Sequence, residues 1–303
     1  MNRKNFIKKT AAAATFLSSG AINISCLNKK KIRKKITILH TNDVHSHIFP
    51  IGSVNNKKTN LGGVSRRATL IKKIRETNPN TLLFDAGDIF QGTPYFNYFG
   101  GELEFKLMSL LKYDASTIGN HDFDNGIEGL HAQLPNAKFD FISSNYDFSN
   151  TIMDGHVKKY RIFQKDKIKI GVFGLGVELN GLVNSNAYKE TKYLDPIEIA
   201  QDLSGFLKND KKCDLIICLS HLGYKYKNQK KVSDVILAKK TKDIDLIIGG
   251  HTHTLLDRPT KLINAANKIV LVNQVGCFGT HLGKIDFYVN SKTKYYKSQI
   301  LSV

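Results

Sequence analysis

Short apolar runs alternate with amphipathic segments along most of the chain. The runs at residues 215–219 and 246–248 are apolar throughout, which is typical of strands buried on both faces. Pro196 stands where helices prefer proline, at the first position of an amphipathic segment. The pattern predicts helices over residues 63–76, 102–111, 125–134 and 196–207, and strands over residues 36–40, 81–84, 115–118, 141–143, 167–173, 215–219, 246–248, 269–273, 284–289 and 295–300.

This alternation, followed by strands alone after residue 269, predicts an α/β fold in which helices cover the sheets. No internal repeat or low-complexity linker interrupts residues 36–303, so we expect one domain there. The 303 residues are 41% hydrophobic and 23% charged, as is ordinary for a globular protein. No stretch approaches the roughly 20 apolar residues that a membrane-spanning helix needs.

The first 26 residues have a different character. Basic residues within the first nine positions precede an apolar and small-residue run over 10–24, which is the order of an export signal rather than of a plain N-terminal helix. The start resembles a twin-arginine signal with Lys4 in place of the second arginine, and residues 24–26 resemble a lipoprotein cleavage box in which Cys26 would be acylated. We predict an export signal and basic tether over residues 1–35, and a periplasmic or membrane-anchored protein of the cell envelope.

The formal net charge of +19 raises the question of nucleic-acid binding. Ten of the 45 basic residues and none of the 26 acidic ones lie within residues 1–35, so the remainder carries +9. The other lysines are scattered, which argues against a specific nucleic-acid surface. A basic surface still favours anionic phosphate substrates and an anionic membrane nearby.

Three further cysteines offer no chemistry in the sequence. Cys213 and Cys218 bracket one predicted strand with an odd spacing, which places them on opposite faces and excludes a bridge between them. Neither they nor Cys277 belong to a C-x-x-C pair, and we expect three free or buried thiols without a zinc or redox role.

A recurring pattern at five predicted strand ends does suggest chemistry. Each apolar run is followed at once by Asp, His or Asn, and ligands bind beyond the carboxyl ends of such strands. The five segments are Ile38-Leu39-His40-Thr41-Asn42-Asp43-Val44-His45, Leu83-Phe84-Asp85-Ala86-Gly87-Asp88, Thr117-Ile118-Gly119-Asn120-His121-Asp122, Ile217-Cys218-Leu219-Ser220-His221 and Ile247-Ile248-Gly249-Gly250-His251-Thr252-His253. Any one of them has an ordinary explanation as a turn, cap or surface residue. All five together favour a polar cluster on one rim.

The residue types indicate a metal centre. In Asp-x-His and His-x-His, residues two apart on an extended segment would point to the same side. Carboxylate, imidazole and amide ligands without thiolate suit Mn²⁺, Zn²⁺ or Fe²⁺. A set of this size with a shared carboxylate describes two divalent metal ions, which lower the pKa of a bound water and clamp a phosphoryl group.

These motifs, in this order, resemble the calcineurin-like metallophosphoesterase superfamily. Within it, Leu39-His40-Thr41-Asn42-Asp43, Gly62-Gly63, Gly87-Asp88-x-x-Gln91-Gly92-Thr93 and Asn120-His121-x-x-Asp124 resemble the catalytic domain of the 5′-nucleotidases. The resemblance runs from about residue 36 to the end of the sequence. It implies a four-layer αββα sandwich of two mixed sheets.

The resemblance also implies roles for single residues. One metal ion would be bound by Asp43, His45, Asp88 and His253. The other would be bound by Asp88, Asn120, His221 and His251, with Asp88 shared between the two. His121 would be the catalytic histidine, oriented by Asp124, and a metal-activated water would be the nucleophile. Outside this set, we expect His40 to be a buried strand-end residue and His47 a loop residue.

The expected function is hydrolysis of phosphate esters, with nucleoside 5′-monophosphates the favoured substrates. Hydrolysis of 2′,3′-cyclic nucleotides or nucleotide-sugar pyrophosphates is the alternative, since the same metal site serves both. A non-catalytic metal- or nucleotide-binding lipoprotein would have no use for His121 and Asp124. The nucleotidases that the chain resembles usually carry a C-terminal substrate domain. Because the sequence stops at Val303, we expect that domain to be absent and either supplied in trans by a separate protein or not needed.

Overall fold

The computed structural model describes residues 34–54, 57–290 and 294–303. The predicted export signal, Cys26 and most of the basic tether lie outside these residues. Strand β1 (Lys34–Thr41) begins two residues before the predicted start of the domain, so Lys34 and Lys35 are part of a strand. In the part of the chain that the structure describes, no helix is both long enough and apolar enough to cross a membrane.

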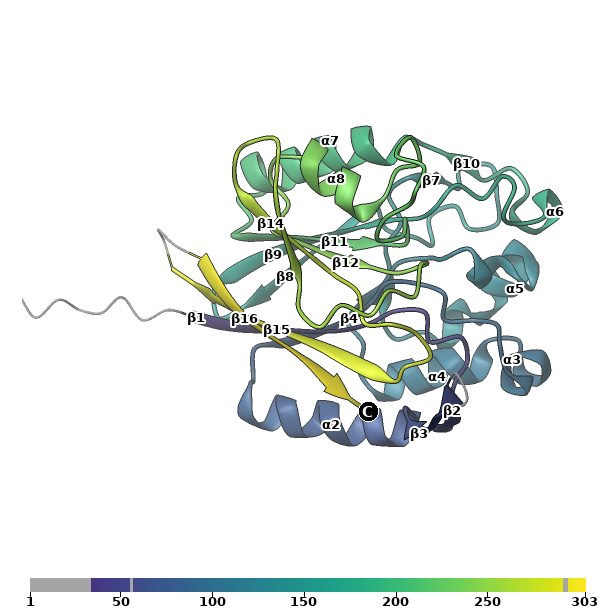
Figure 1. The fold of residues 1–303 in the computed structure, drawn as a ribbon. Coiled ribbons are helices and arrows are strands. Elements are labelled where there is room, and N and C mark those ends of the chain that lie inside the picture. The colour runs from purple at the N-terminus through teal and green to yellow at the C-terminus, as the bar shows by residue number, and fades with distance from the viewer. Residues whose placement is uncertain (1–33, 55–56, 291–293) are drawn as a thin grey trace, which may run out of the picture. The chain divides into compact units, whose positions relative to one another are not determined.

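Two six-stranded mixed sheets form the centre of the domain (Figure 1). The first has the order β16-β15-β1-β4-β5-β6, in which β1, β4, β5 and β6 are parallel and β15 is antiparallel to both of its neighbours, β1 and β16. The second has the order β13-β14-β12-β11-β9-β8, with four parallel strands between two antiparallel edge strands.

The strands of the first sheet, besides β1, are β4 (Thr81–Asp85), β5 (Ala115–Ser116), β6 (Asp140–Phe141), β15 (His281–Val289) and β16 (Lys294–Ser302). Those of the second are β8 (Tyr160–Lys165), β9 (Ile168–Leu175), β11 (Leu215–Ser220), β12 (Leu246–Gly249), β13 (Thr260–Ile263) and β14 (Ile269–Asn273). Two small pairs complete the strands: β2 (Ile51–Val54) with β3 (Lys57–Leu61), and β7 (Tyr146–Asp147) with β10 (Lys192–Tyr193).

Helices cover the outer face of each sheet (Figure 1). On the first sheet lie α2 (Val64–Thr77), α4 (Glu102–Leu110) and α5 (Gly126–Gln133), together with α3 (Pro94–Phe99). On the second lie α7 (Pro196–Asn209) and α8 (Asp234–Lys240), and the short helix α6 (Ser185–Tyr188) precedes α7. Helix α7 begins where the sequence predicts, because Pro196 is its first residue and Asp195 accepts hydrogen bonds from the backbone of Ile197 and Glu198.

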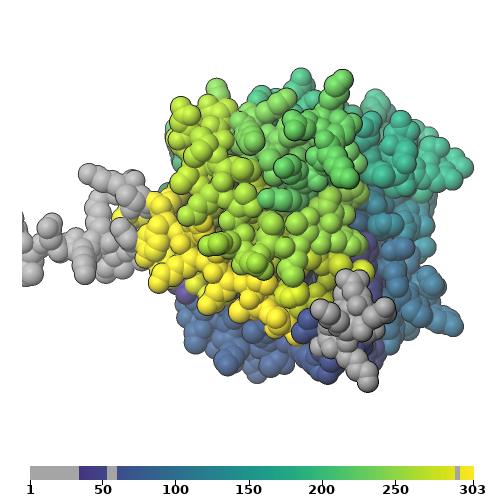
Figure 2. Space-filling model, viewed as in Figure 1, coloured from purple at the N-terminus to yellow at the C-terminus, as the bar shows by residue number. Residues whose placement is uncertain are grey.

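Three hydrophobic cores separate these four layers. On β1, Ile38 faces the core between the two sheets and its neighbour Leu39 faces the core under α2 and α4, as alternation along a strand requires. The third core packs Leu207 of α7 and Leu237 of α8 against the second sheet. The space-filling view shows the yellow C-terminal residues between the blue and the green parts of the domain (Figure 2). The four-layer αββα fold that the resemblance implies is therefore confirmed.

The four predicted helices are present, each within two residues of its predicted ends. The pattern missed three short helices, α3, α6 and α8, because segments of four to seven residues contain too few turns to show a helical period. It also missed the edge strands β8 and β13, in which exposed and half-buried residues replace the fully apolar run of a central strand.

Candidate metal centre and active site

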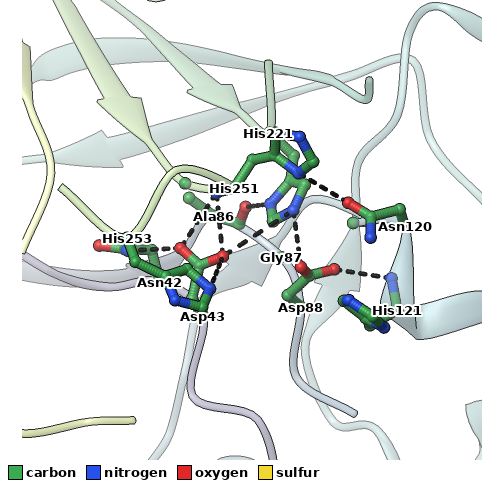
Figure 3. A network of polar contacts seen from close by, with 12 residues as sticks. Asn42, Asp43, Ala86, Gly87, Asp88, Asn120, His121, His221, His251 and His253 are labelled. Carbon is green, nitrogen blue, oxygen red and sulfur yellow. Dashed lines mark hydrogen bonds and ion pairs between the residues drawn. The ribbon is translucent and has the colours of Figure 1, made fainter. Parts of the chain in front are cut away.

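The candidate residues meet at the carboxyl ends of the parallel strands (Figure 3). The first sheet provides the loops after β1, β4 and β5, and the second sheet provides the loops after β11 and β12. The structure thus brings together all of the residues for which the resemblance implies a metal-binding role: Asp43, His45, Asp88 and Asn120 from the first sheet, and His221, His251 and His253 from the second.

One group consists of Asp43, His45 and His253, whose ligand atoms all lie within 4.8 Å of one another. The Nε2 atoms of His45 and His253 are 3.0 Å apart. Asp43 Oδ1 lies 3.4 Å from His253 Nε2 and 4.0 Å from His45 Nε2. These three atoms surround a point that a single cation could occupy.

A second group consists of Asp88, His221 and His251, again with ligand atoms within 4.8 Å of one another. Asp88 Oδ2 is 3.0 Å from His221 Nε2 and 3.9 Å from His45 Nε2, so this carboxylate faces both groups. The Nδ1 atom of His251 lies 2.8 Å from the amide oxygen of Asn120, which brings Asn120 to the same place (Figure 3).

The hydrogen bonds of the imidazoles suit metal binding. His221 Nδ1 donates to the carbonyl of Ala86 at 2.7 Å, and His45 Nδ1 donates to the carbonyl of Phe90 at 3.1 Å. This fixes the tautomer and leaves both Nε2 lone pairs directed into the cluster. His221 Nε2 is buried and makes no hydrogen bond of ordinary geometry, although Asp88 Oδ2 is only 3.0 Å away. Two acceptor atoms this close require a proton or a cation, and the oxygen and nitrogen donors fit a divalent metal.

The ionisable side chains of the cluster shift one another's pKa values. Burial lowers the pKa of His221, but the carboxylates of Asp88 and Asp43 outweigh it and raise this pKa to about 10. Burial would raise the pKa of Asp88, but the imidazoles, chiefly that of His221, hold it well below its usual range. The pKa of His251 is lowered to about 4 by burial and by His221, so this imidazole is neutral, as a metal ligand must be.

The backbone of the cluster is strained. Five of the seven candidate ligands have a positive φ: Asp43 (49°), His45 (48°), Asp88 (56°), His251 (72°) and His253 (51°). Such values are uncommon outside glycine and concentrate at functional sites. They also correct one expectation, because neither Asp-x-His nor His-x-His is extended. His251 and His253 accordingly face different groups.

His121 and Asp124 form a pair beside the cluster. His121 Nδ1 lies 3.0 Å from Asp124 Oδ2, and the backbone N–H of His121 donates to Asp88 Oδ1 at 2.8 Å. The hydrogen bond to Asp124 is the main reason that the pKa of His121 is raised. Its side chain is 37% exposed, and its Nε2 has no hydrogen-bond partner among the described residues. The imidazole is therefore oriented on one side and open on the other.

Asp122 is a site residue to which the sequence assigned no role. Its buried carboxylate accepts hydrogen bonds from the backbone N–H groups of Asp88, Ile89, Phe90 and Gly119, at 2.8 to 3.2 Å. Burial and the nearby charge of Asp88 raise its pKa to about 7. Asp122 thus ties the loop after β4 to the loop after β5. The only sequence signal is its place next to His121 in a strand-end motif.

The segment at Cys277 and Phe278 also reaches the cluster. The three described cysteines are free thiols, as expected, but Cys277 lies near His253 and, after Asp43, contributes most to raising that imidazole's pKa to about 10. The ring of Phe278 lies 6.0 Å from the ring of His45 and 5.8 Å from that of His253. Nothing in the local sequence of this segment indicates its proximity to the site.

Comparison with known proteins agrees with the site. The model of the calcineurin-like phosphoesterase family matches residues 36–255. The chain belongs to this family. Calcineurin-like phosphoesterases use divalent metals, and the family and its relatives confirm the expected class of enzyme, a hydrolase that acts on phosphate esters.

Several relatives of this phosphoesterase have nucleotide substrates in their names. It is 35% identical over 285 residues to a snake venom 5′-nucleotidase of Naja atra, a match that covers 87% of this chain and 52% of the relative. It is 33% identical over 289 residues to the trifunctional nucleotide phosphoesterase protein YfkN of Bacillus subtilis, which covers 85% of this chain and 18% of the relative. The crystal structure of a 5′-nucleotidase precursor from Thermus thermophilus superposes with a TM-score of 0.81 at 33% identity, over 89% of this chain and 55% of that one. The chain thus spans about half the length of the first of these relatives.

Proposed function

We propose that the enzyme hydrolyses nucleoside 5′-monophosphates at a centre of two divalent cations. The observation that carries the proposal is the position of Asp88, whose carboxylate faces both ligand groups while its other oxygen accepts the backbone N–H of His121. Both ligand groups and the backbone of the candidate catalytic histidine thus meet at one carboxylate. The relatives named 5′-nucleotidase support the choice of substrate.

The proposed ligands follow the two groups. One cation would be held by Asp43, His45, Asp88 and His253, and the other by Asp88, Asn120, His221 and His251. When bound, two such ions lower the pKa of water and neutralise the oxygens of a phosphoryl group. The donor set favours Mn²⁺, Zn²⁺ or Fe²⁺.

The protein itself would orient the reacting groups. Asp124 holds His121 with Nδ1 protonated, so that Nε2 is the atom available to the phosphoryl group or to the leaving oxygen. Asp122 holds the loop that carries Asp88, and the carbonyls of Ala86 and Phe90 hold His221 and His45. Each of these residues acts by fixing the position of an atom before substrate arrives.

A second candidate substrate class is supported by the match to a protein named as a trifunctional nucleotide phosphoesterase. The same centre would then also cleave phosphodiesters such as 2′,3′-cyclic nucleotides.

Export and acylation of Cys26 remain predictions from the sequence.

A substrate panel tests the proposal. Purified protein loaded with Mn²⁺ is incubated with AMP and other nucleoside 5′-monophosphates, 2′,3′-cyclic AMP, a nucleotide sugar and a simple aryl phosphate. Loss of substrate and formation of product are followed by chromatography, because hydrolysis of a cyclic phosphodiester or a pyrophosphate bond releases no inorganic phosphate. We expect the 5′-monophosphates to have the highest kcat/KM. A higher value for the cyclic nucleotide would favour the second class, and equal values for the aryl phosphate would contradict nucleotide specificity. Hydrolysis of none of them would contradict the whole proposal.

A further inference from the structure

Two histidine pairs in the described part of the chain bring their Nε2 atoms within hydrogen-bond distance. One is His45 with His253, at 3.0 Å, inside the proposed catalytic centre. The other is His131 with His156, at 3.3 Å. The second pair lines a hollow of about 390 Å³ to which no residue of the catalytic centre contributes. The pair of His131 and His156 therefore lies outside the catalytic centre, although the distance between its Nε2 atoms is similar to that of the pair inside it.

The spacing of the second pair matches a metal site. Two imidazole nitrogens bound tetrahedrally to one ion at about 2.0–2.1 Å lie roughly 3.3–3.4 Å apart. The ring centres of His131 and His156 are 4.7 Å apart at an interplanar angle of 82°. An end-to-end N–H···N hydrogen bond of this length would separate the ring centres by roughly 5.5 Å. The rings therefore meet at an angle rather than end to end.

Both imidazoles stand on ordered backbone. His131 lies in the last turn of α5, the helix that begins two residues after Asp124 (Figure 1). His156 ends a turn in which its N–H donates to the carbonyl of Met153 at 3.0 Å, and the side chain of Met153 is fully buried. Because each backbone is anchored independently, an ion would have to fix only the side-chain torsions of the two residues.

The surroundings define the class of ligand. Asp140 also lines the hollow, but its carboxylate oxygens contact Lys158 and Arg161 and are not free to bind a cation. Two imidazoles alone favour Zn²⁺, Ni²⁺ and Cu²⁺ over Mg²⁺ or Mn²⁺. We propose that His131 and His156 form a further metal site, which binds a divalent transition-metal ion through their Nε2 atoms and leaves the remaining positions to water.

Zinc stoichiometry and anomalous diffraction test this proposal. The wild type, His131→Gln, His156→Asn and the matched control His281→Asn are dialysed against Zn²⁺, and bound zinc is counted per chain. His281 is suitable as a control because it is half-buried on β15, with its Nδ1 3.0 Å from the hydroxyl of Thr280. Crystals of the wild type soaked in Zn²⁺ are measured at the zinc absorption edge.

We expect the wild type and His281→Asn to bind one more zinc per chain than His131→Gln and His156→Asn. An anomalous peak should lie about 2 Å from both Nε2 atoms. Equal stoichiometry in all four proteins, or crystals without that peak, would overturn the proposal and leave the pair as an ordinary hydrogen bond.

The result is independent of the proposed function. Phosphate release with Mn²⁺ should be unchanged in His131→Gln and His156→Asn, since neither residue belongs to the catalytic centre. An inactive wild type that still binds zinc between His131 and His156 would contradict the proposed function alone. The two variants also check each other, because a folding defect in one would not affect the other.

Discussion

The imidazole of His121 is held by Asp124 on one side and has no described partner at Nε2. Its side chain belongs to neither ligand group. We therefore expect His121→Ala to lower kcat by about 10²- to 10⁴-fold, the usual contribution of a proton-transfer group, while bound metal stays near the wild-type amount. Turnover of AMP and metal analysis of the same preparation measure both quantities.

Asp124→Asn is the companion change to His121→Ala. Loss of the orienting carboxylate should lower kcat by about 10- to 100-fold, less than loss of the imidazole itself. The double variant should be no worse than His121→Ala, because Asp124 would act only through His121. If His121→Ala instead lost metal, His121 would be a ligand and its assignment here would be wrong.

His40 gives a prediction about pH. It is fully buried at the end of β1, as the sequence predicts, where its Nε2 accepts a hydrogen bond from Asn273 at 2.9 Å. Burial lowers its pKa from 6.5 to about 3. Below pH 6.5 the unfolded state therefore binds one more proton than the folded state, and stability decreases as pH falls.

The change His40→Gln isolates this effect. Between about pH 6 and pH 4, the wild type should lose about 1.4 kcal/mol per pH unit more than the variant does. Urea unfolding at a series of pH values, in metal-free buffer, measures the two slopes. Parallel curves would mean that His40 is protonated in the folded protein.

Among the elements, the loops after β4 and β5 are joined through Asp122. This carboxylate accepts four backbone N–H groups, and one of them belongs to Asp88. Asn at this position would present an NH₂ group to some of these donors and break their hydrogen bonds. We expect Asp122→Asn to weaken metal affinity by about 10- to 100-fold, measured by metal retained on dialysis. Asp154→Asn, in an exposed turn, is the control and should retain wild-type affinity.

The sequence predicts elements well where a period is long enough to be seen. Helix α2 has fourteen residues and one apolar side, and it was found; α8 has seven and was missed. Within each sheet the meeting of the strand-end motifs was predictable, because parallel strands end at one edge of a sheet. The approach of the two sheet edges, which joins three motifs of the first sheet to two of the second, depends on how the sheets pack. The positive φ values at Asp43 and His251, and the approach of Cys277 to His253, depend on distant contacts that no local pattern contains.

In the whole molecule, the proposed metal centre spans both sheets. Asp43 and Asp88 come from the first sheet, and His221 and His251 come from the second. Cations that bind only this assembled state should stabilise it, by about 2.7 kcal/mol when free metal is 100 times its Kd. Chelation should therefore lower Tm, and titration with Mn²⁺ should restore it.

The change His221→Ala tests whether this stabilisation comes from the catalytic centre. The variant should respond to Mn²⁺ much less than the wild type does, because one of the two proposed ion sites is incomplete. His281→Asn should respond like the wild type. Equal Tm shifts in all three proteins would place the stabilising ion elsewhere.

Strand β1 lies between β4 and β15, so its neighbours in the first sheet are separated by about 200 positions of the chain. During synthesis β1 can pair with β4 early, but its other edge stays open until β15 has left the ribosome. An open edge of this kind invites pairing with other chains. The sheet that carries Asp43 is thus completed only after residues 281–289 have been synthesised, and a nascent chain stalled before residue 281 would be both inactive and prone to aggregate.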